Sequence, residues 1–127
     1  MLDASAASRH GARMHELGIA QSALERALEE MRKAGASRVS RIVLRVGRLS
    51  GVDAGSLRFA FEAVRGDTAA AEAELQIDET PAVAHCPTCD ADFTPASGPP
   101  FACPRCQAWS GTIVHGRELD LMRVEMV

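Results

Sequence analysis

The stretch HCPTCDADFTPASGPPFACPRC, residues 85–106, contains all four cysteines of the 127-residue chain. They form two Cys-Pro-X-Cys pairs, Cys86 with Cys89 and Cys103 with Cys106. Each pair places two thiolates on one tight turn, so four sulfur atoms can surround one ion as a tetrahedron. Thirteen residues separate the pairs, and the glycine and prolines at 98–100 are typical of a loop. The spacing therefore predicts a structural zinc site with these four ligands.

The segment around these cysteines, residues 81–116, is too poor in apolar side chains to fold by itself. Its larger apolar residues include Val83, Phe93, Phe101, Trp109 and Ile113. Structural zinc contributes about 10 to 16 kcal/mol to the folding of small modules, so a metal supplies what the core lacks. Four thiolates also complete the coordination of zinc, so the site is suited to stabilising the fold and not to hydrolysis.

A redox dithiol is the alternative interpretation of Cys-Pro-X-Cys, because the same motif occurs in disulfide exchange. Two copies in a loop-rich segment without a βαβ pattern favour metal binding. The chain also lacks an apolar stretch of about 20 residues for spanning a membrane, and it lacks an N-terminal signal-peptide segment. We therefore expect a cytoplasmic protein whose thiols stay reduced and available for a metal.

Charge is distributed unevenly along the chain, whose formal net charge is −3. Residues 26–65 contain nine basic and four acidic residues, whereas residues 67–127 contain ten acidic residues and three arginines. Nucleic-acid binding depends largely on Lys and Arg, so the acidic cysteine half argues against it. Arg41 and Arg45 share one face of a predicted strand, which is either a solvated face or a docking patch for an acidic partner.

Apolar periodicity outside the cysteine segment predicts two helices and three strands. One helix spans residues 16–34, with glycine at 35 as its cap; a second follows Asp53, which is placed to cap it, and ends before Gly66. Two strands are predicted at residues 41–47 and 73–80. The alternation in residues 118–127 predicts a third strand, with a bulge at Leu121 and Met122.

These elements predict an α+β fold in which two helices pack on a small mixed sheet. The last strand follows the cysteine segment and needs partners from the strands before it. We therefore expect a zinc-ribbon-like module, residues 81–116, inserted into a domain formed by residues 14–80 and 117–127. Residues 1–13 are small and polar without periodicity, so we expect a disordered extension or a start of translation at Met14.

Met14, His15 and Glu16 open the first predicted helix. A glutamate there is ordinary, since it complements the helix dipole. In a chain that starts at Met14, however, the terminal amine, the His15 amide and the His15 imidazole can form fused chelate rings around square-planar nickel or copper. With residues 1–13 retained that amine cannot coordinate, and nickel would need a second amide, a carboxylate or the nearby His10.

Several segments together resemble the HypA/HybF family of hydrogenase maturation factors: MHELGIAQSAL (14–24), VLRVGRLSGVD (43–53), FAFEAV (59–64), the two cysteine pairs and LMRVEMV (121–127). The resemblance covers residues 14–127. It implies a nickel metallochaperone, not an enzyme, that works with a HypB-type GTPase and inserts nickel into the large subunit of [NiFe]-hydrogenase. For some members it also implies a supply of nickel to urease maturation factors.

By position, the resemblance implies that nickel binds at His15 and Glu16, with Asp53 as a further carboxylate ligand or a nearby acid. It implies structural zinc at the four cysteines. Of the two histidines near the module, His85 and His115, each is either a surface residue or a group that replaces a thiolate or tunes the zinc site. Both a monomer and a homodimer stay open.

Two other classes of function compete with a nickel chaperone. A zinc-ribbon adaptor without nickel would account for the cysteines but would give His15, Glu16 and Asp53 no role. A metallohydrolase built on those three residues would lack the second or third histidine that such sites usually contain.

Overall fold

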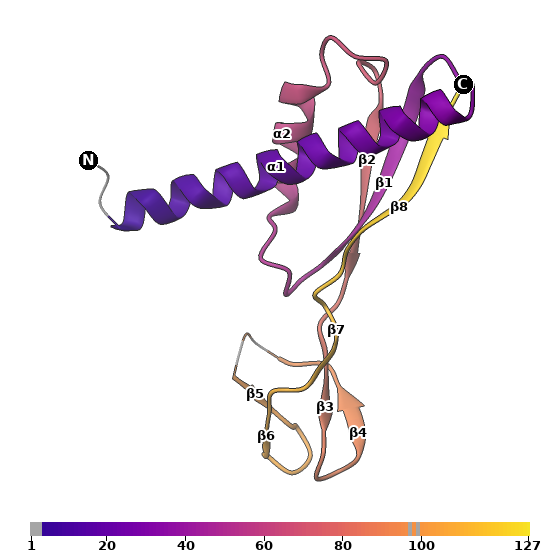
Figure 1. Ribbon diagram of the computed structural model, residues 1–127. Coiled ribbons are helices and arrows are strands. Elements are labelled where there is room, and N and C mark those ends of the chain that lie inside the picture. The colour runs from indigo at the N-terminus through magenta and orange to yellow at the C-terminus, as the bar shows by residue number, and fades with distance from the viewer. Residues whose placement is uncertain (1–3, 97, 99) are drawn as a thin grey trace.

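The computed structural model describes residues 4–96, 98 and 100–127 and has the predicted α+β fold (Figure 1). Its elements, in chain order, are α1 (Ala4–Lys33), β1 (Val39–Gly47), α2 (Ala54–Val64), β2 (Glu74–Thr80), β3 (Val83–Cys86), β4 (Ala91–Phe93), β5 (Phe101–Ala102), β6 (Trp109–Ser110), β7 (Ile113–His115) and β8 (Leu119–Met126). No helix in the described part of the chain has both the length and the apolar character needed to cross a membrane.

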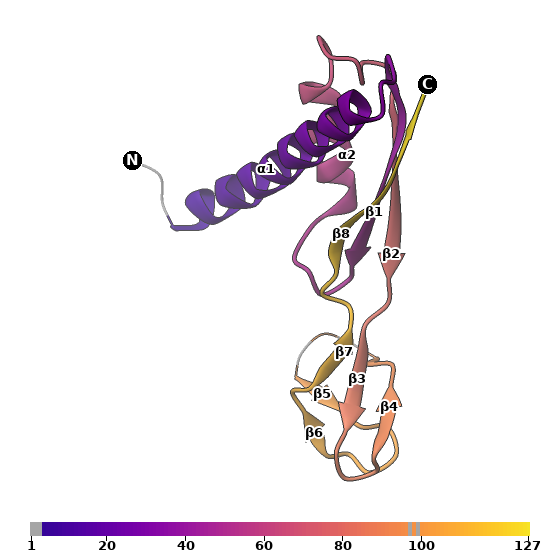
Figure 2. The same cartoon turned by 45° about the vertical axis from the view of Figure 1, so that its right-hand side comes forward.

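Strand β1 lies at the centre of a mixed three-stranded sheet with the order β2-β1-β8. It runs parallel to β2 and antiparallel to β8, so the strand after the cysteine segment completes the sheet as predicted. Helices α1 and α2 pack against each other on one face of this sheet (Figures 1 and 2). Ile42, Leu44 and Val46 of β1 form the core together with Leu57 and Phe61 of α2.

Strand β8 contains the bulge that the sequence predicts. Leu44 pairs with Leu121 and the neighbouring Val43 pairs with Arg123, so Met122 has no partner in β1. The extra residue lets Leu121 and Val124 both pack against the core although three positions separate them.

Helix α1 is longer than the predicted helix at its N-terminal end. It begins at Ala4, so residues 4–13 are helical in the structure, in contrast to the irregular extension that we expected; residues 1–3 lie outside the described part. The expectation rested on apolar periodicity, which reports contact with a core, whereas alanine favours a helix without any such contact. At the other end, Gly35 has a φ of 70° and caps the helix, as predicted.

The cysteine segment forms a module of short strands at one end of the mixed sheet (Figure 2). Its strands make two small sheets with the orders β4-β3-β7 and β5-β6. Where the module joins the sheet, the Leu49 N–H donates to the Gly116 carbonyl at 2.6 Å, and the Gly116 N–H donates to the Glu118 carboxylate at 2.7 Å. A side chain at Gly47 would overlap the Gly116 backbone, so this crossing requires glycine.

Candidate metal centre

The four predicted zinc ligands meet at one point of the module. Their Sγ atoms all lie within 4.8 Å of one another. Cys86 Sγ is 3.5 Å from Cys106 Sγ, and Cys89 Sγ is 3.9 Å from Cys103 Sγ, so the cysteines are free thiols. Four sulfurs at about 2.3 Å from a central ion form a tetrahedron with edges of about 3.8 Å. The donor atoms and their separations thus fit one tetrahedral, thiolate-binding ion.

Both cysteine pairs lie on turns of the same design. Asp90 (φ 51°) and Gln107 (φ 65°) each directly follow the second cysteine of a pair and take the left-handed conformation that turns the chain back. In each turn a backbone N–H donates to the first sulfur of the pair at 3.4 Å: Cys89 to Cys86, and Arg105 to Cys103. These N–H groups favour the negatively charged thiolate.

Hydrogen bonds give two of the thiols very different pKa values. The backbone N–H groups of Cys106 and Arg105 lower the pKa of Cys103 to about 7. The hydrogen bond with the Cys106 thiol, followed by burial, raises the pKa of Cys89 to about 12. The backbone N–H groups around Cys103 thus favour its thiolate, whereas the Cys106 thiol and burial favour the neutral thiol of Cys89.

Neither histidine near the module belongs to the cysteine cluster. His85 Nδ1 lies 2.8 Å from the Asp92 carboxylate, and its Nε2 lies 3.4 Å from the Asp90 carboxylate. His115 Nδ1 lies 3.4 Å from Glu118, and its side chain is 58% exposed. Nearby carboxylates thus contact both rings: Asp90 and Asp92 contact His85, and the largely buried Glu118 contacts His115.

Among residues 15–96, 98 and 100–127, Glu16 is the one buried charged side chain, with 3% of its surface exposed. Its Oε2 accepts a hydrogen bond from the Asp53 N–H at 2.8 Å. Asp53 caps α2 as predicted, because its carboxylate accepts the Ser56 N–H at 2.8 Å, and this bond lowers the pKa of Asp53. Glu16 thus ties α1 to the first turn of α2.

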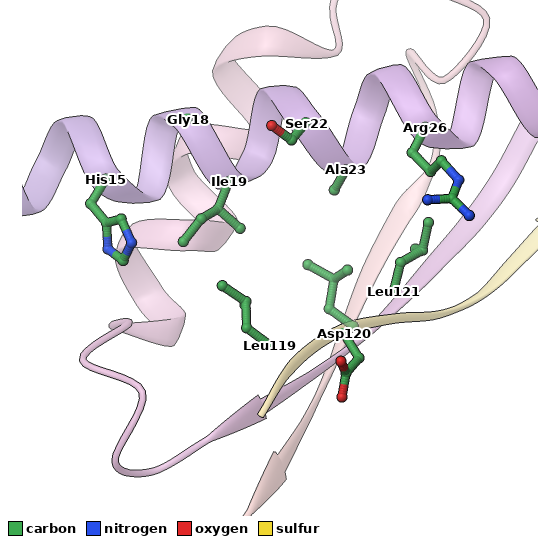
Figure 3. A pocket seen from close by; sticks show the side chains of 10 residues that line it. His15, Gly18, Ile19, Ser22, Ala23, Arg26, Leu119, Asp120 and Leu121 are labelled. Carbon is green, nitrogen blue, oxygen red and sulfur yellow. The ribbon is translucent and has the colours of Figure 1, made fainter. Parts of the chain in front are cut away.

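The His15 side chain lies on a different side of α1. It is exposed and lines a groove between α1 and β8, close to Leu119 (Figure 3). Consecutive helical side chains point about 100° apart, so His15 and the buried Glu16 face different surroundings. Within the described ranges, the cysteine cluster is the one group of three or more ligating side chains close enough to share an ion. The structure therefore does not gather His15, Glu16 and Asp53 around a common point.

The arginines on the outer face of β1 interact within the sheet. Arg41 lies 3.1 Å from Glu74 of β2 and 3.6 Å from Glu125 of β8. Arg45 Nη2 lies 3.1 Å from Met122 Sδ. These contacts favour a solvated strand face over a docking patch for an acidic partner.

A family model described as hydrogenase/urease nickel incorporation, metallochaperone, hypA, matches residues 14–126. The chain belongs to the HypA family. The protein called hydrogenase maturation factor HypA in Chloroflexus aurantiacus is 46% identical over 112 residues, which are 88% of this chain and 98% of the relative. The protein of the same name in Synechococcus elongatus is 42% identical over 116 residues, covering 90% of this chain and all of the relative.

Two solved structures of HypA proteins share the fold. A solution structure of HypA superposes with a TM-score of 0.67 and 27% identity, covering 90% of this chain and 97% of the other. The solution structure of the Ni metallochaperone HypA from Helicobacter pylori gives a TM-score of 0.59 and 25% identity, covering 88% and 97%. HypA is thus a family of metallochaperones, and this chain has its fold.

The sequence did not predict two features of this HypA-family chain. One is the buried position of Glu16, which is spaced helically with the buried Ala20, Ala23 and Ala27, so the pattern could have placed it on the core-facing side. The other is the groove beside His15. It exists because β8 lies next to α1, and no local pattern encodes that contact.

Proposed function

We propose that this HypA-family chain binds Ni(II) around His15 and delivers it, with a HypB-type GTPase, to the large subunit of [NiFe]-hydrogenase. One observation carries the proposal: the ligating groups are divided between a closed four-thiolate cluster and an exposed histidine next to the residue where the family match begins. A closed cluster suits a permanent metal. An exposed histidine with open coordination suits a metal that must be released.

The proposed metal of the cysteine cluster is structural Zn(II). The sulfur separations of 3.5 and 3.9 Å support this, because they bracket the edge of a zinc–thiolate tetrahedron. The module also buries few apolar side chains, among them Ala84 and Phe101, so zinc would supply most of its stability. A zinc ion bound by four thiolates has no open coordination position, so the site would stabilise the fold and would not catalyse a reaction.

The helical backbone explains why the start of the chain matters for nickel. In the interior of α1, the N–H of His15 donates its helical hydrogen bond to the carbonyl four residues earlier. In a chain that begins at Met14, the same N–H is among the first four of the helix and has no helical acceptor. Its deprotonation then costs no hydrogen bond, and the terminal amine, the amide and the imidazole of His15 can bind a square-planar ion.

We also propose Glu16 and Asp53 for the nickel site, although the structure does not gather them with His15 at one point. The hydrogen bond between the Glu16 carboxylate and the Asp53 N–H supports their inclusion, because it keeps the loop before α2 beside the first family-matched turn of α1. The Asp53 carboxylate is oriented by the Ser56 N–H and stays ionised, so it would supply negative charge near a bound cation. We assign both residues as ligands or neighbours of nickel.

The proposed partners follow from the family to which the chain belongs. They are a HypB-type GTPase, the hydrogenase large subunit and, for a second client, urease maturation factors. We expect the chain to bind these partners in the cytoplasm.

Transfer of radioactive nickel tests this function. The chain beginning at Met14 is loaded with zinc and one equivalent of labelled nickel, then mixed with the HypB-type GTPase and nickel-free large subunit and separated by size. We expect the label to move to the large subunit. His15→Ala should deliver none, whereas His115→Ala, which alters an exposed histidine outside the site, should deliver as much as the parent chain. Equal delivery by both variants would contradict the assignment of His15.

A further inference from the structure

A groove of about 540 Å³ lies between helix α2 and the outer strand β2 of the mixed sheet. Three arginines line it, Arg58 and Arg65 from α2 and Arg41 from β1. Two carboxylates, Glu62 and Glu74, line it as well, so its positive charges outnumber its negative ones. A groove of this volume is large enough to hold a small molecule.

Backbone carbonyls hold two of these arginines in place. Arg58 Nη1 donates to the Leu75 carbonyl at 2.7 Å, and Arg65 Nη1 donates to the Ala73 carbonyl. The Arg65 guanidinium also lies over the ring of Phe61, 5.8 Å from its centroid. A guanidinium has five N–H donors, so one carbonyl leaves most of them available to a ligand. The two groups are therefore oriented before any ligand arrives.

The charges of Arg58 and Arg65 are not neutralised by nearby carboxylates. Arg41 is paired with Glu74 at 3.1 Å, whereas neither Arg58 nor Arg65 forms an ion pair within the described residues. Glu62 follows Arg58 by four residues and precedes Arg65 by three, which is a spacing that permits helical ion pairs, yet it contacts neither guanidinium. Two oriented cations without partners suit an anion from another molecule.

The separation of the two arginines indicates the kind of anion. Their acceptors, the carbonyls of Ala73 and Leu75, belong to alternate residues, which lie about 6 to 7 Å apart along an extended chain. An oxyanion that accepts a hydrogen bond of about 2.8 Å on each side can bridge groups at this distance. The planar guanidinium matches the oxygen atoms of both phosphate and carboxylate.

We propose that this groove binds the oxyanion group of a small molecule between Arg58 and Arg65. The group is a phosphate or a carboxylate, because the two share the oxygen geometry that a guanidinium recognises. Glu62 lowers the affinity by repelling the ligand, so strongly charged anions bind best. The site involves α2 and β2 alone and requires no nickel, so it is independent of the proposed function.

Nuclear magnetic resonance of the ¹⁵N-labelled, zinc-loaded full chain tests this site. Inorganic phosphate, pyrophosphate and succinate are added separately, at constant ionic strength, up to about 10 mM. We expect saturable shifts of amide signals in residues 58–65 and 73–77. Saturation by the phosphates alone would assign a phosphoryl ligand, saturation by succinate alone a carboxylate, and saturation by all three a site for either group.

Three variants identify the groups that bind. Arg58→Gln removes a hydrogen-bonding charge and should weaken binding at least about tenfold. Arg38→Gln removes the same charge from an exposed position outside the groove and should bind like the parent chain. Glu62→Gln removes the repulsion and should strengthen binding about twofold to fivefold.

The amide spectrum of each variant also verifies its fold. Absence of saturable shifts with all three anions overturns the proposal, and so does equal weakening by Arg58→Gln and Arg38→Gln, which would indicate a general effect of charge. If Arg58→Gln does not fold, Glu62→Gln decides: an affinity that stays unchanged or falls also overturns the proposal.

Discussion

The carboxylate of Glu16 is buried, and a hydrogen bond from the backbone of Asp53 stabilises it there. Its Oε2 accepts the Asp53 N–H, and its surface is 3% exposed. Glu16→Ala would leave that donor without its partner, so we expect a loss of about 1.5 to 3 kcal/mol in the free energy of unfolding. Urea denaturation measures this loss in the free energy of unfolding, and Glu25→Ala on the exposed face of α1 is the control. Equal stability of the two variants would refute a structural role for Glu16.

Asp53 gives the fold a dependence on pH. The Ser56 N–H lowers the pKa of Asp53 in the folded state, so its capping bond stabilises fully above the ordinary aspartate pKa of about 3.9. That contribution is lost as the pH falls through the lowered value. We therefore expect Asp53→Ala to lower the melting temperature near neutral pH and to approach the parent chain in acid. A difference that stayed constant down to strongly acidic pH would contradict the cap.

At the scale of elements, the sequence predicted those whose burial leaves a periodic pattern. Strand β1, helix α2 and the bulged β8 were all expected, because alternating or helically spaced apolar residues face the core they share. Strands β5 and β6 have two residues each, too few for any pattern. The four cysteines were predictable as a cluster, because their spacing alone restricts the ways a tetrahedron can close.

The residues of the proposed nickel site are a different case. Asp53 was expected to cap α2 and does, since the cap depends on local sequence. The contact between Glu16 and Asp53 joins positions 37 residues apart, and the groove beside His15 depends on how α1 lies over β8. Such contacts arise from tertiary packing, so no local pattern could reveal them.

The junction between the mixed sheet and the cysteine module tolerates no side chain at Gly47. A Cβ atom there would overlap backbone atoms of Gly116, which cannot move aside as a flexible side chain could. We expect Gly47→Ala to destabilise the chain by about 1 to 3 kcal/mol through overpacking. Thermal unfolding compares it with Gly66→Ala, where a Cβ meets nothing within 4 Å. Equal melting temperatures for Gly47→Ala and Gly66→Ala would contradict a steric overlap at Gly47.

At the scale of the whole molecule, the two parts should respond differently to loss of the module's metal. The mixed sheet has its own apolar core under α1 and α2, whereas the module depends on its four cysteines. We expect a chelator to remove hydrogen-exchange protection from residues 83–115 while β1 stays protected. The single tryptophan, Trp109 in β6, would report the same change by fluorescence. A module that stayed protected without metal would contradict a structural zinc site.

Calorimetric titration of nickel into the zinc-loaded chain beginning at Met14, with His15→Ala beside it, tests the proposed nickel site at His15. We expect tight binding of about one nickel ion that disappears in the variant while zinc stays bound. We also expect weaker binding to the chain beginning at Met1, because the His15 N–H then lies inside α1. No nickel binding, or binding that survives His15→Ala, would contradict the nickel site and favour a zinc-stabilised adaptor instead.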